Sequence, residues 1–260
     1  MRTISPFLIV SAVMSVSLGT SAAFAQDGKP EANQPKQHKA SPAPAKAGQV
    51  VGRVGDPYSL DTCPVTGKKL GSMGDAVVMQ YDGREVRFCC PACPPKFEKD
   101  LAANLAKIDQ QITKDQGPLY PLTISVVTGK DLPAKPCEFV YGNRLIRVGT
   151  ENEKADFIKD PKRYLGELDK AVIAAQEKDY PLKACPVSKE ALGGDMGKPV
   201  DLVVGGRLVR LCCKDCRKEI EKEPAKFVAM VDAARKAERK DKSGGDEKGN
   251  EDHKGHDHGK

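Results

Sequence analysis

The sequence contains no tryptophan, and aromatic residues make up only 5% of its 260 positions. A platform of stacked aromatic side chains for single-stranded nucleic acid is therefore not indicated. Histidine is also scarce, and residues 56–240 contain none. Because that region also lacks a Ser/His/Asp arrangement and a phosphate-binding loop, we expect a protein that is not an enzyme.

Charge of one sign is not concentrated anywhere along the chain. The formal net charge is +6, from 42 Lys and Arg against 36 Asp and Glu, and no run of five like charges occurs. Such a pattern is typical of solvated helix faces rather than of a basic surface that binds an anionic partner. We expect no nucleic-acid partner.

The one long apolar run lies near the N-terminus. Arg2 precedes an apolar stretch from Phe7 to Leu18, and Ala23-Phe24-Ala25 resembles a signal-peptidase site. We expect residues 1–25 to be a signal peptide cleaved after Ala25, so that the protein is periplasmic or secreted. An uncleaved anchor is the alternative, although the run is short for a membrane span, so no stable membrane anchor is expected.

Composition divides the rest of the chain. Residues 26–55 are rich in Lys, Pro, Ala, Gln and Gly, and predict a disordered linker. Residues 241–260 predict a second disordered segment, a charged tail with His253, His256 and His258. The intervening region suits several small modules better than one large core. We place module 1 at 56–117, module 2 at 118–177 and module 3 at 178–240, and call them the first, middle and third repeats.

Nine cysteines stand out against this background, and eight of them form two sets of four. Each set has one cysteine, then a long gap of nearly the same length in both sets, then a Cys-Cys-x-x-Cys cluster. The sets are Cys63, Cys89, Cys90 and Cys93, and Cys185, Cys212, Cys213 and Cys216. Four soft ligands gathered twice at one spacing indicate thiolate metal sites.

The frame around the cysteines repeats three times. Tyr58, Tyr120 and Tyr180 open the copies at a nearly constant period. Each opening is followed by two short apolar runs around Asp-Gly, Gly-Asn or Gly-Gly, which predicts a tight β-hairpin. Apolar residues at intervals of three and four then predict one bent helix or two short ones. The fold class we expect is α+β, with tandem modules of hairpin, cysteine knuckle and helix.

The middle repeat has lost the cysteines. It carries Ser125, Gly149 and Glu153 where the other repeats have theirs, although its strand and helix pattern survives. We therefore expect it to keep the fold and to hold no metal.

Spacing favours three converging thiolates per site. Cysteines three and four apart meet at a strand–helix junction, and Cys63 or Cys185 returns from the far side of the hairpin. Zinc and copper(I) both accept such soft ligands, so we expect about two ions of either metal. Cys90 and Cys213 are candidates for a fourth ligand, but adjacent cysteines seldom bind one ion together. Met73 and Met196 occupy matching positions and would favour copper(I), or would simply fill the core.

The order Cys-Pro-Val, hairpin, apolar-Cys-x3-Cys and Phe-x2-Asp-Pro-x2-Tyr resembles the YHS and TRASH family of small metal-binding modules. The resemblance implies a treble-clef-like fold, a role in heavy-metal sensing, trafficking or resistance, and a transport or resistance protein as partner. It also implies metal ligation by Cys63, Cys89 and Cys93, and by Cys185, Cys212 and Cys216. Two departures are Cys90 and Cys213, where the family has a small polar residue, and Asp100-Leu101, where it has Asp-Pro.

Other interpretations stay open at this level. In an oxidising compartment the clusters could form structural disulfides, or the Cys-x-x-Cys pairs could exchange thiols. The protein would then be a stapled interaction repeat or a redox protein. Cys137 has no aligned partner and is most simply a buried small residue, with a link to another chain as the alternative. The tail histidines either gather zinc, nickel or copper(II) loosely or are incidental.

Overall fold

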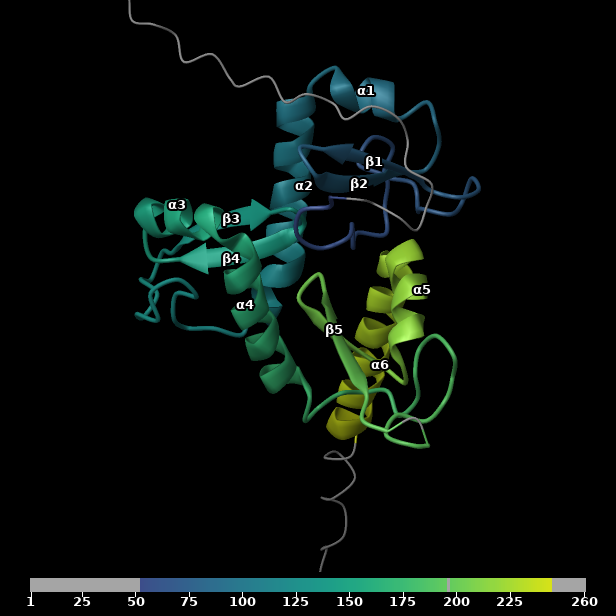
Figure 1. Ribbon diagram of the computed structural model, residues 1–260. Coiled ribbons are helices and arrows are strands. Elements are labelled where there is room, and N and C mark those ends of the chain that lie inside the picture. The colour runs from purple at the N-terminus through teal and green to yellow at the C-terminus, as the bar shows by residue number, and fades with distance from the viewer. Residues whose placement is uncertain (1–51, 196, 245–260) are drawn as a thin grey trace, which may run out of the picture. The chain divides into compact units, whose positions relative to one another are not determined.

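The computed structural model describes residues 52–195 and 197–244, and this region is a mixture of helices and small antiparallel hairpins (Figure 1). The element order of two strands followed by two helices occurs three times. The first repeat contains β1 (Val77–Tyr81), β2 (Arg84–Phe88), α1 (Pro94–Glu98) and α2 (Leu101–Gln116). The middle repeat contains β3 (Cys137–Tyr141), β4 (Arg144–Val148), α3 (Glu151–Lys159) and α4 (Pro161–Gln176). The third contains β5 (Val200–Val204), β6 (Arg207–Leu211), α5 (Arg217–Lys222) and α6 (Pro224–Gly244).

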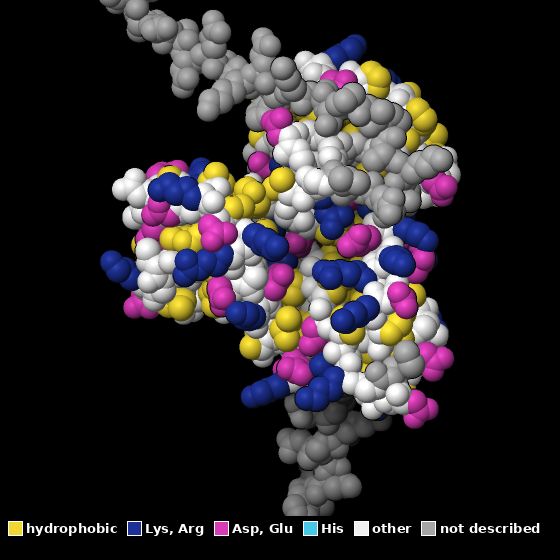
Figure 2. All heavy atoms as spheres, viewed as in Figure 1, with side chains coloured by type: hydrophobic (Ala, Val, Ile, Leu, Met, Phe, Trp, Pro, Cys, Tyr) yellow, Lys and Arg dark blue, Asp and Glu magenta, His cyan; other side chains and the backbone are white. Residues whose placement is uncertain are grey.

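Two short 3₁₀ helices complete the described elements, Gly117–Leu119 after α2 and Lys214–Cys216 before α5. The α+β class expected from the sequence is confirmed. The predicted signal peptide and most of the predicted linker and tail lie outside the described residues. Within the described part, no helix is both long and apolar enough to cross a membrane. The face drawn in Figure 2 carries basic and acidic side chains interspersed.

Each hairpin is a pair of short strands closed by a two-residue turn. Tyr81 pairs with Arg84, Tyr141 with Arg144, and Val204 with Arg207. The turns need backbone in the left-handed region, which glycine adopts without a steric penalty. Asp82 and Gly83 have φ of 51° and 78°, and Gly205 and Gly206 have 55° and 74°. The Asp-Gly, Gly-Asn and Gly-Gly pairs therefore form the turns that the sequence predicts.

The helical part of every repeat is two helices rather than one bent helix. The residue between them has nearly the same backbone conformation in each repeat: φ −140° and ψ 63° at Asp100, −142° and 63° at Asp160, −133° and 57° at Glu223. Proline follows Asp160 and Glu223, but leucine follows Asp100. The break therefore does not require proline, and the first repeat keeps the shape with leucine at this position.

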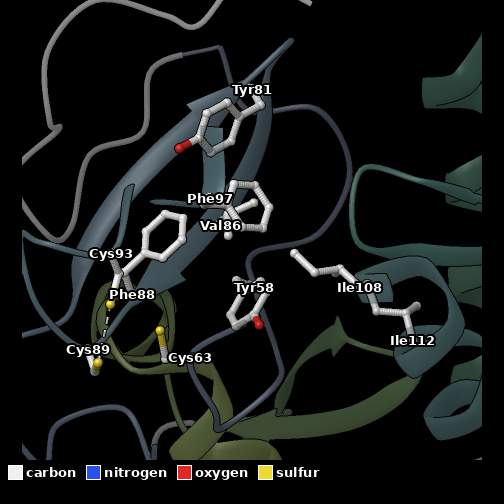
Figure 3. Packing of buried hydrophobic residues seen from close by; sticks show 10 residues of the cluster. All are labelled: Tyr58, Cys63, Tyr81, Val86, Phe88, Cys89, Cys93, Phe97, Ile108 and Ile112. Atoms are coloured by element: carbon white, nitrogen blue, oxygen red, sulfur yellow. Dashed lines mark hydrogen bonds between the residues drawn. The ribbon is translucent and has the colours of Figure 1, made fainter. Parts of the chain in front are cut away.

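The described residues contain three apolar clusters, one in each repeat. In the first, Phe97 of α1 packs edge-on against Phe88 of β2, with ring centroids 5.2 Å apart, and against Tyr81 (Figure 3). In the middle repeat Phe157 takes the place of Phe97, and in the third Ile220 does. Each cluster is small, so other interactions must hold the hairpin to the helices.

A largely buried arginine after each turn provides one such interaction. Arg84, Arg144 and Arg207 each pair with an aspartate on the second helix of their own repeat, and the three aspartates occupy one repeat position: Asp109, Asp169 and Asp232. The Arg144 guanidinium is fully buried, and its pKa is raised because Asp56 and Asp169 outweigh the opposing effect of burial. One hydrogen-bonded ion pair thus joins strand to helix at the same place in every repeat.

The repeats contact one another through backbone and amide groups. The Gln116 side chain at the end of α2 donates to the Asn143 carbonyl at 2.8 Å and accepts from the Leu145 N–H at 2.9 Å. Gln176 at the end of α4 does the same with Gly206 and Leu208. Each of these two helices therefore ends on the hairpin of the next repeat.

Residues 52–59 lie against all three hairpin turns. The Val54 N–H donates to the Gly83 carbonyl, and a Cβ on Gly142 would stand 2.2 Å from the Val54 oxygen. The Asp56 carboxylate accepts from Arg144 at 2.8 Å and from the Gly205 N–H at 2.7 Å. Residues 52–55, expected at the end of a disordered linker, instead pack among the turns, because backbone groups rather than large apolar side chains hold them. All described residues belong to one compact unit, residues 38–260.

Replacing Arg144 with methionine should lower the free energy of unfolding by about 3 kcal/mol, since it leaves Asp56 and Asp169 without their buried cation. Urea unfolding followed by circular dichroism, at equal metal content, would measure the change. The matched control is Arg163→Met on the exposed face of α4, for which we expect less than about 0.5 kcal/mol. Equal midpoints for both variants would contradict the role given to Arg144.

Candidate metal centres

The first cysteine of each site sits in a closed turn. The Cys63 N–H donates to the Lys68 carbonyl, and the Gly67 N–H donates to the Cys63 carbonyl, both at 2.8 Å. Ser125 and Cys185 form the same two bonds in their repeats. The fifth residue of the turn has φ of 69° every time, although it is Lys189 rather than glycine in the third repeat. The turn therefore forms whether or not its first residue is cysteine.

The other two cysteines lie where the second strand passes into the first helix. Cys89 follows Phe88, the last residue of β2, and Cys93 immediately precedes α1. The Cys93 N–H donates to the Cys90 carbonyl at 3.2 Å, closing a tight bend. This bend brings the Cys89 and Cys93 sulfurs to 3.7 Å from each other. Strand, bend and helix thus place two thiols at one point.

The three predicted ligands of each site converge. The sulfurs of Cys63, Cys89 and Cys93 lie within 4.8 Å of one another, and so do those of Cys185, Cys212 and Cys216. All six residues are buried. Figure 3 shows the first triad at one end of the apolar cluster, with its sulfurs directed toward one another. The sequence prediction of two three-thiol groups is confirmed.

The spacing suits a metal ion better than a disulfide. Three sulfurs around one ion at Zn–S distances near 2.3 Å stand roughly 3.8–4.0 Å apart, whereas bonded sulfurs are about 2.05 Å apart. Cys89–Cys93 and Cys212–Cys216 are both 3.7 Å, and all nine cysteines, which lie within the described residues, are free. The donor set therefore fits a thiophilic ion.

Hydrogen bonds prepare part of each triad for the anionic form. Burial alone would raise the pKa of Cys63, but the N–H groups of Cys89 and Val65 and the Thr66 side chain outweigh it and lower this pKa to about 7. The pKa of Cys185 is lowered to about 7 against burial in the same way, mainly by Ser188 and the Cys212 N–H. By contrast, burial and the neighbouring thiols raise the pKa of Cys216 to about 12. A metal ion would displace the proton from this last thiol on binding.

Sequence reasoning missed the hydroxyl beside each triad. Thr66 Oγ1 lies 3.4 Å from the Cys89 sulfur, and Ser188 Oγ lies 3.2 Å from the Cys212 sulfur. The signal was present, because Thr66, Thr128 and Ser188 occupy one position of the repeated turn. Such hydroxyls can donate to a thiolate and fix its direction.

Cys90 and Cys213 stand beside the triads rather than in them. The Cys90 sulfur is 3.5 Å from that of Cys93, and the Cys213 sulfur is 3.7 Å from that of Cys216. Neither belongs to the group of mutually close sulfurs, and both are partly exposed. They are therefore not positioned as the fourth corner of a closed site.

The middle repeat fills the same space with a carboxylate. Glu153, at the position of Cys93 and Cys216, accepts hydrogen bonds from the Ser125 hydroxyl and from the Gly149 N–H at 3.0 Å. A Cβ on Gly149 would stand 2.9 Å from the carboxylate, so glycine leaves it room. Ser125 and Gly149 take the places of the other two cysteines. Three hydrogen-bonding groups thus close the junction that three thiols occupy elsewhere.

The remaining predicted ligands are not gathered at the triads. Met73 is 54% exposed, and its sulfur lies 3.9 Å from the Lys68 ammonium. Met196 and the tail residues His253, His256 and His258 lie outside the described residues. Cys137 is half-buried rather than buried, and its thiol donates to Glu151 at 3.0 Å.

No protein-family model matches this chain, and no curated protein or solved structure is significantly similar to it. The assignment of a function therefore depends on the geometry of the two sites and on the sequence patterns.

Replacing Glu153 with glutamine should destabilise the protein by about 1–2 kcal/mol at neutral pH, because a neutral amide accepts more weakly from Ser125 and Gly149. The Ser125 hydroxyl is the main cause that holds the pKa of Glu153 below its usual range. A depressed pKa contributes stability above the unfolded value of about 4.3 and loses it as the pH falls through the folded value.

The difference from wild type should therefore be complete at pH 7 and shrink as the pH falls below about 4. Unfolding by urea at several pH values would measure it. Glu167→Gln, on the exposed face of α4, is the control. A difference that stays constant down to the lowest pH at which the protein is folded would show that the charge of Glu153 does not matter.

Proposed function

We propose that this chain is an exported, non-enzymatic protein that binds soft metal ions at two buried thiolate sites, in order to buffer, sense or deliver them. One observation carries the proposal: two triads of the same geometry occur in a chain whose middle repeat keeps the fold without one. Export is inferred from the signal-like residues 1–25 alone.

The middle repeat supports a role for the metal beyond holding the fold. Its hairpin and helix pair follow the order of the other repeats, and Ser125, Gly149 and Glu153 close the strand–helix junction by hydrogen bonds. A junction that needed only mechanical closure could use these simpler groups in all three repeats. Keeping three thiols twice therefore favours a function of the ion itself.

The donors favour zinc or copper(I). Each described triad consists of thiols alone, without a carboxylate or imidazole among the converging ligands. Soft thiolates select such ions over magnesium, calcium or manganese. The YHS and TRASH resemblance supports the same class, and with it a metal-transport or resistance protein as partner.

A redox role is the second candidate, favoured by the contact between Cys90 and Cys93. These thiols are three residues apart, with their sulfurs 3.5 Å from each other at the start of α1. They would need only a modest approach to form a disulfide. The first experiment must therefore count thiols as well as metal.

That experiment is to purify the chain without reductant from the compartment to which it is exported, and to measure bound metal and free thiols together. About two tightly held ions, with all thiols recovered after denaturation and chelation, would support the proposal. No metal and few thiols in the denatured chain would instead favour disulfides. Retention of the circular dichroism spectrum after chelation would separate a delivery site from a structural one.

Replacing Cys63, Cys89 and Cys93 together with serine should halve the tight metal stoichiometry from about two to about one, because the third repeat keeps its own triad. Elemental analysis after dialysis would measure it. Cys137→Ser, which removes a thiol outside both triads, should leave it unchanged. An unchanged stoichiometry in the triple variant would contradict the two-site arrangement.

A further inference from the structure

The half-exposed thiols beside the two sites have no structural role that the fold requires. Cys90 and Cys213 occupy the position of Thr150 in the middle repeat, where the hydroxyl accepts from the Glu153 N–H and caps α3. Threonine is a good residue for this place, since side-chain oxygens satisfy the free N–H groups of a first helical turn. Cys213 makes no such cap, and neither does Cys93 before α1. α1 begins only at Pro94 and α5 only at Arg217, several residues after these cysteines, so neither Cys90 nor Cys213 caps an α-helix.

The position of these sulfurs is the second observation. The triad cysteines are buried, whereas Cys90 and Cys213 are partly exposed. Each nevertheless touches one triad sulfur, Cys93 at 3.5 Å or Cys216 at 3.7 Å, without joining the converging group. The same relation recurs although the two residues between the cysteines differ completely, Pro91-Ala92 against Lys214-Asp215.

We propose that Cys90 and Cys213 are exchange ligands, through which a soft metal ion passes between the buried triad and a thiol-bearing carrier outside. This inference depends on the proposed metal-binding function and deepens it by naming the partner's chemistry. A buried triad alone would release its ion slowly, because water and large chelators cannot reach it. A partly exposed thiol in contact with one triad cysteine would give the ion a route from the buried triad to the surface.

The exchange balances in bonds and protons. The Cys90 thiol gives its proton to solvent and forms a bond to the metal, the Cys93–metal bond breaks, and the Cys93 sulfur takes up a proton. A thiolate of the carrier then binds the ion at its accessible side, and the remaining cysteine–metal bonds break as those sulfurs are protonated. No oxidation state changes, so no oxidant or reductant is needed. Cys213 and Cys216 act in the same way in the third repeat.

The test compares the full chain with the double variant Cys90→Thr/Cys213→Thr, which copies the residue of the middle repeat and should fold normally. Both are loaded with zinc under reducing conditions. Stopped-flow measurement follows transfer to a small dithiol acceptor, 2,3-dimercaptopropanesulfonate, and competition titration measures stoichiometry and affinity. Cys137→Ser is the control for loss of a thiol elsewhere.

We expect the variant to keep two zinc ions with little change in affinity, and to transfer them to the dithiol roughly tenfold more slowly. Each single variant should slow only one of the two kinetic phases. Unchanged transfer rates would overturn the proposal. Loss of a zinc ion, or an affinity lower by about 100-fold, would also overturn it, since the thiol at the affected site would then be a fixed ligand.

Failure of the proposed function would look different. Wild-type protein that holds no zinc and no copper(I) would remove the two metal sites and this inference with them. Wild-type protein that holds two zinc ions, with a variant that transfers them equally fast, would leave the metal sites standing and reject the exchange ligands alone.

Discussion

The junction between hairpin and helices in each repeat depends on one largely buried arginine. Placed directly after the turn, it reaches an aspartate on the second helix, at the same separation along the chain in every repeat. The apolar clusters are small, and a two-stranded hairpin is barely stable alone. The ion pair joins the second strand to the second helix at the same repeat position each time.

The junction between the second strand and the first helix is filled by different groups in different repeats. Thiols occupy it twice, and a carboxylate with a hydroxyl and a glycine N–H occupies it once. The carboxylate would be costly to bury unpaired, whereas the neutral thiols pack as part of the apolar clusters. The hydrogen-bonded groups of the middle repeat satisfy one another, whereas each thiol triad has a geometry that could hold a metal ion. The middle repeat can thus be compared directly with the first and third: its junction is closed by hydrogen bonds, whereas theirs could accept a ligand.

Much of this arrangement could be predicted from the sequence because it is local. Asp82-Gly83, Gly142-Asn143 and Gly205-Gly206 specify their turns by backbone preference, and the spacing of Cys89 and Cys93 specifies two sulfurs at one point. The sequence did not decide whether the helical part of each repeat is one bent helix or two helices. In the first repeat Leu101 replaces the proline that marks the break in the other two. The bonds from Glu153 to Ser125 and Gly149 could not be predicted, because loss of cysteine in an alignment shows what is missing and not what fills the space.

Contacts between residues that are distant in the sequence could not be predicted either. Asp56 directly follows a stretch whose composition suggests a linker, yet it binds Arg144 and the N–H of Gly205. A short polar segment carries no pattern that indicates a partner so far along the chain. The partial exposure of Cys90 and Cys213 could not be predicted for a similar reason, because it depends on which side of the strand–helix junction faces solvent.

The Asp56–Gly205 hydrogen bond, between residues 149 positions apart, also fixes how many repeats the protein can have. In open repeat arrays each unit contacts only its neighbours, so units can be gained or lost during evolution with little harm to the rest. Here the segment before the first hairpin binds the turn of the third, and the middle turn packs against the same segment. A copy added or deleted would leave that segment without its third turn. The middle repeat could therefore do without the thiols, whereas deleting the whole repeat would remove a turn that packs against this segment.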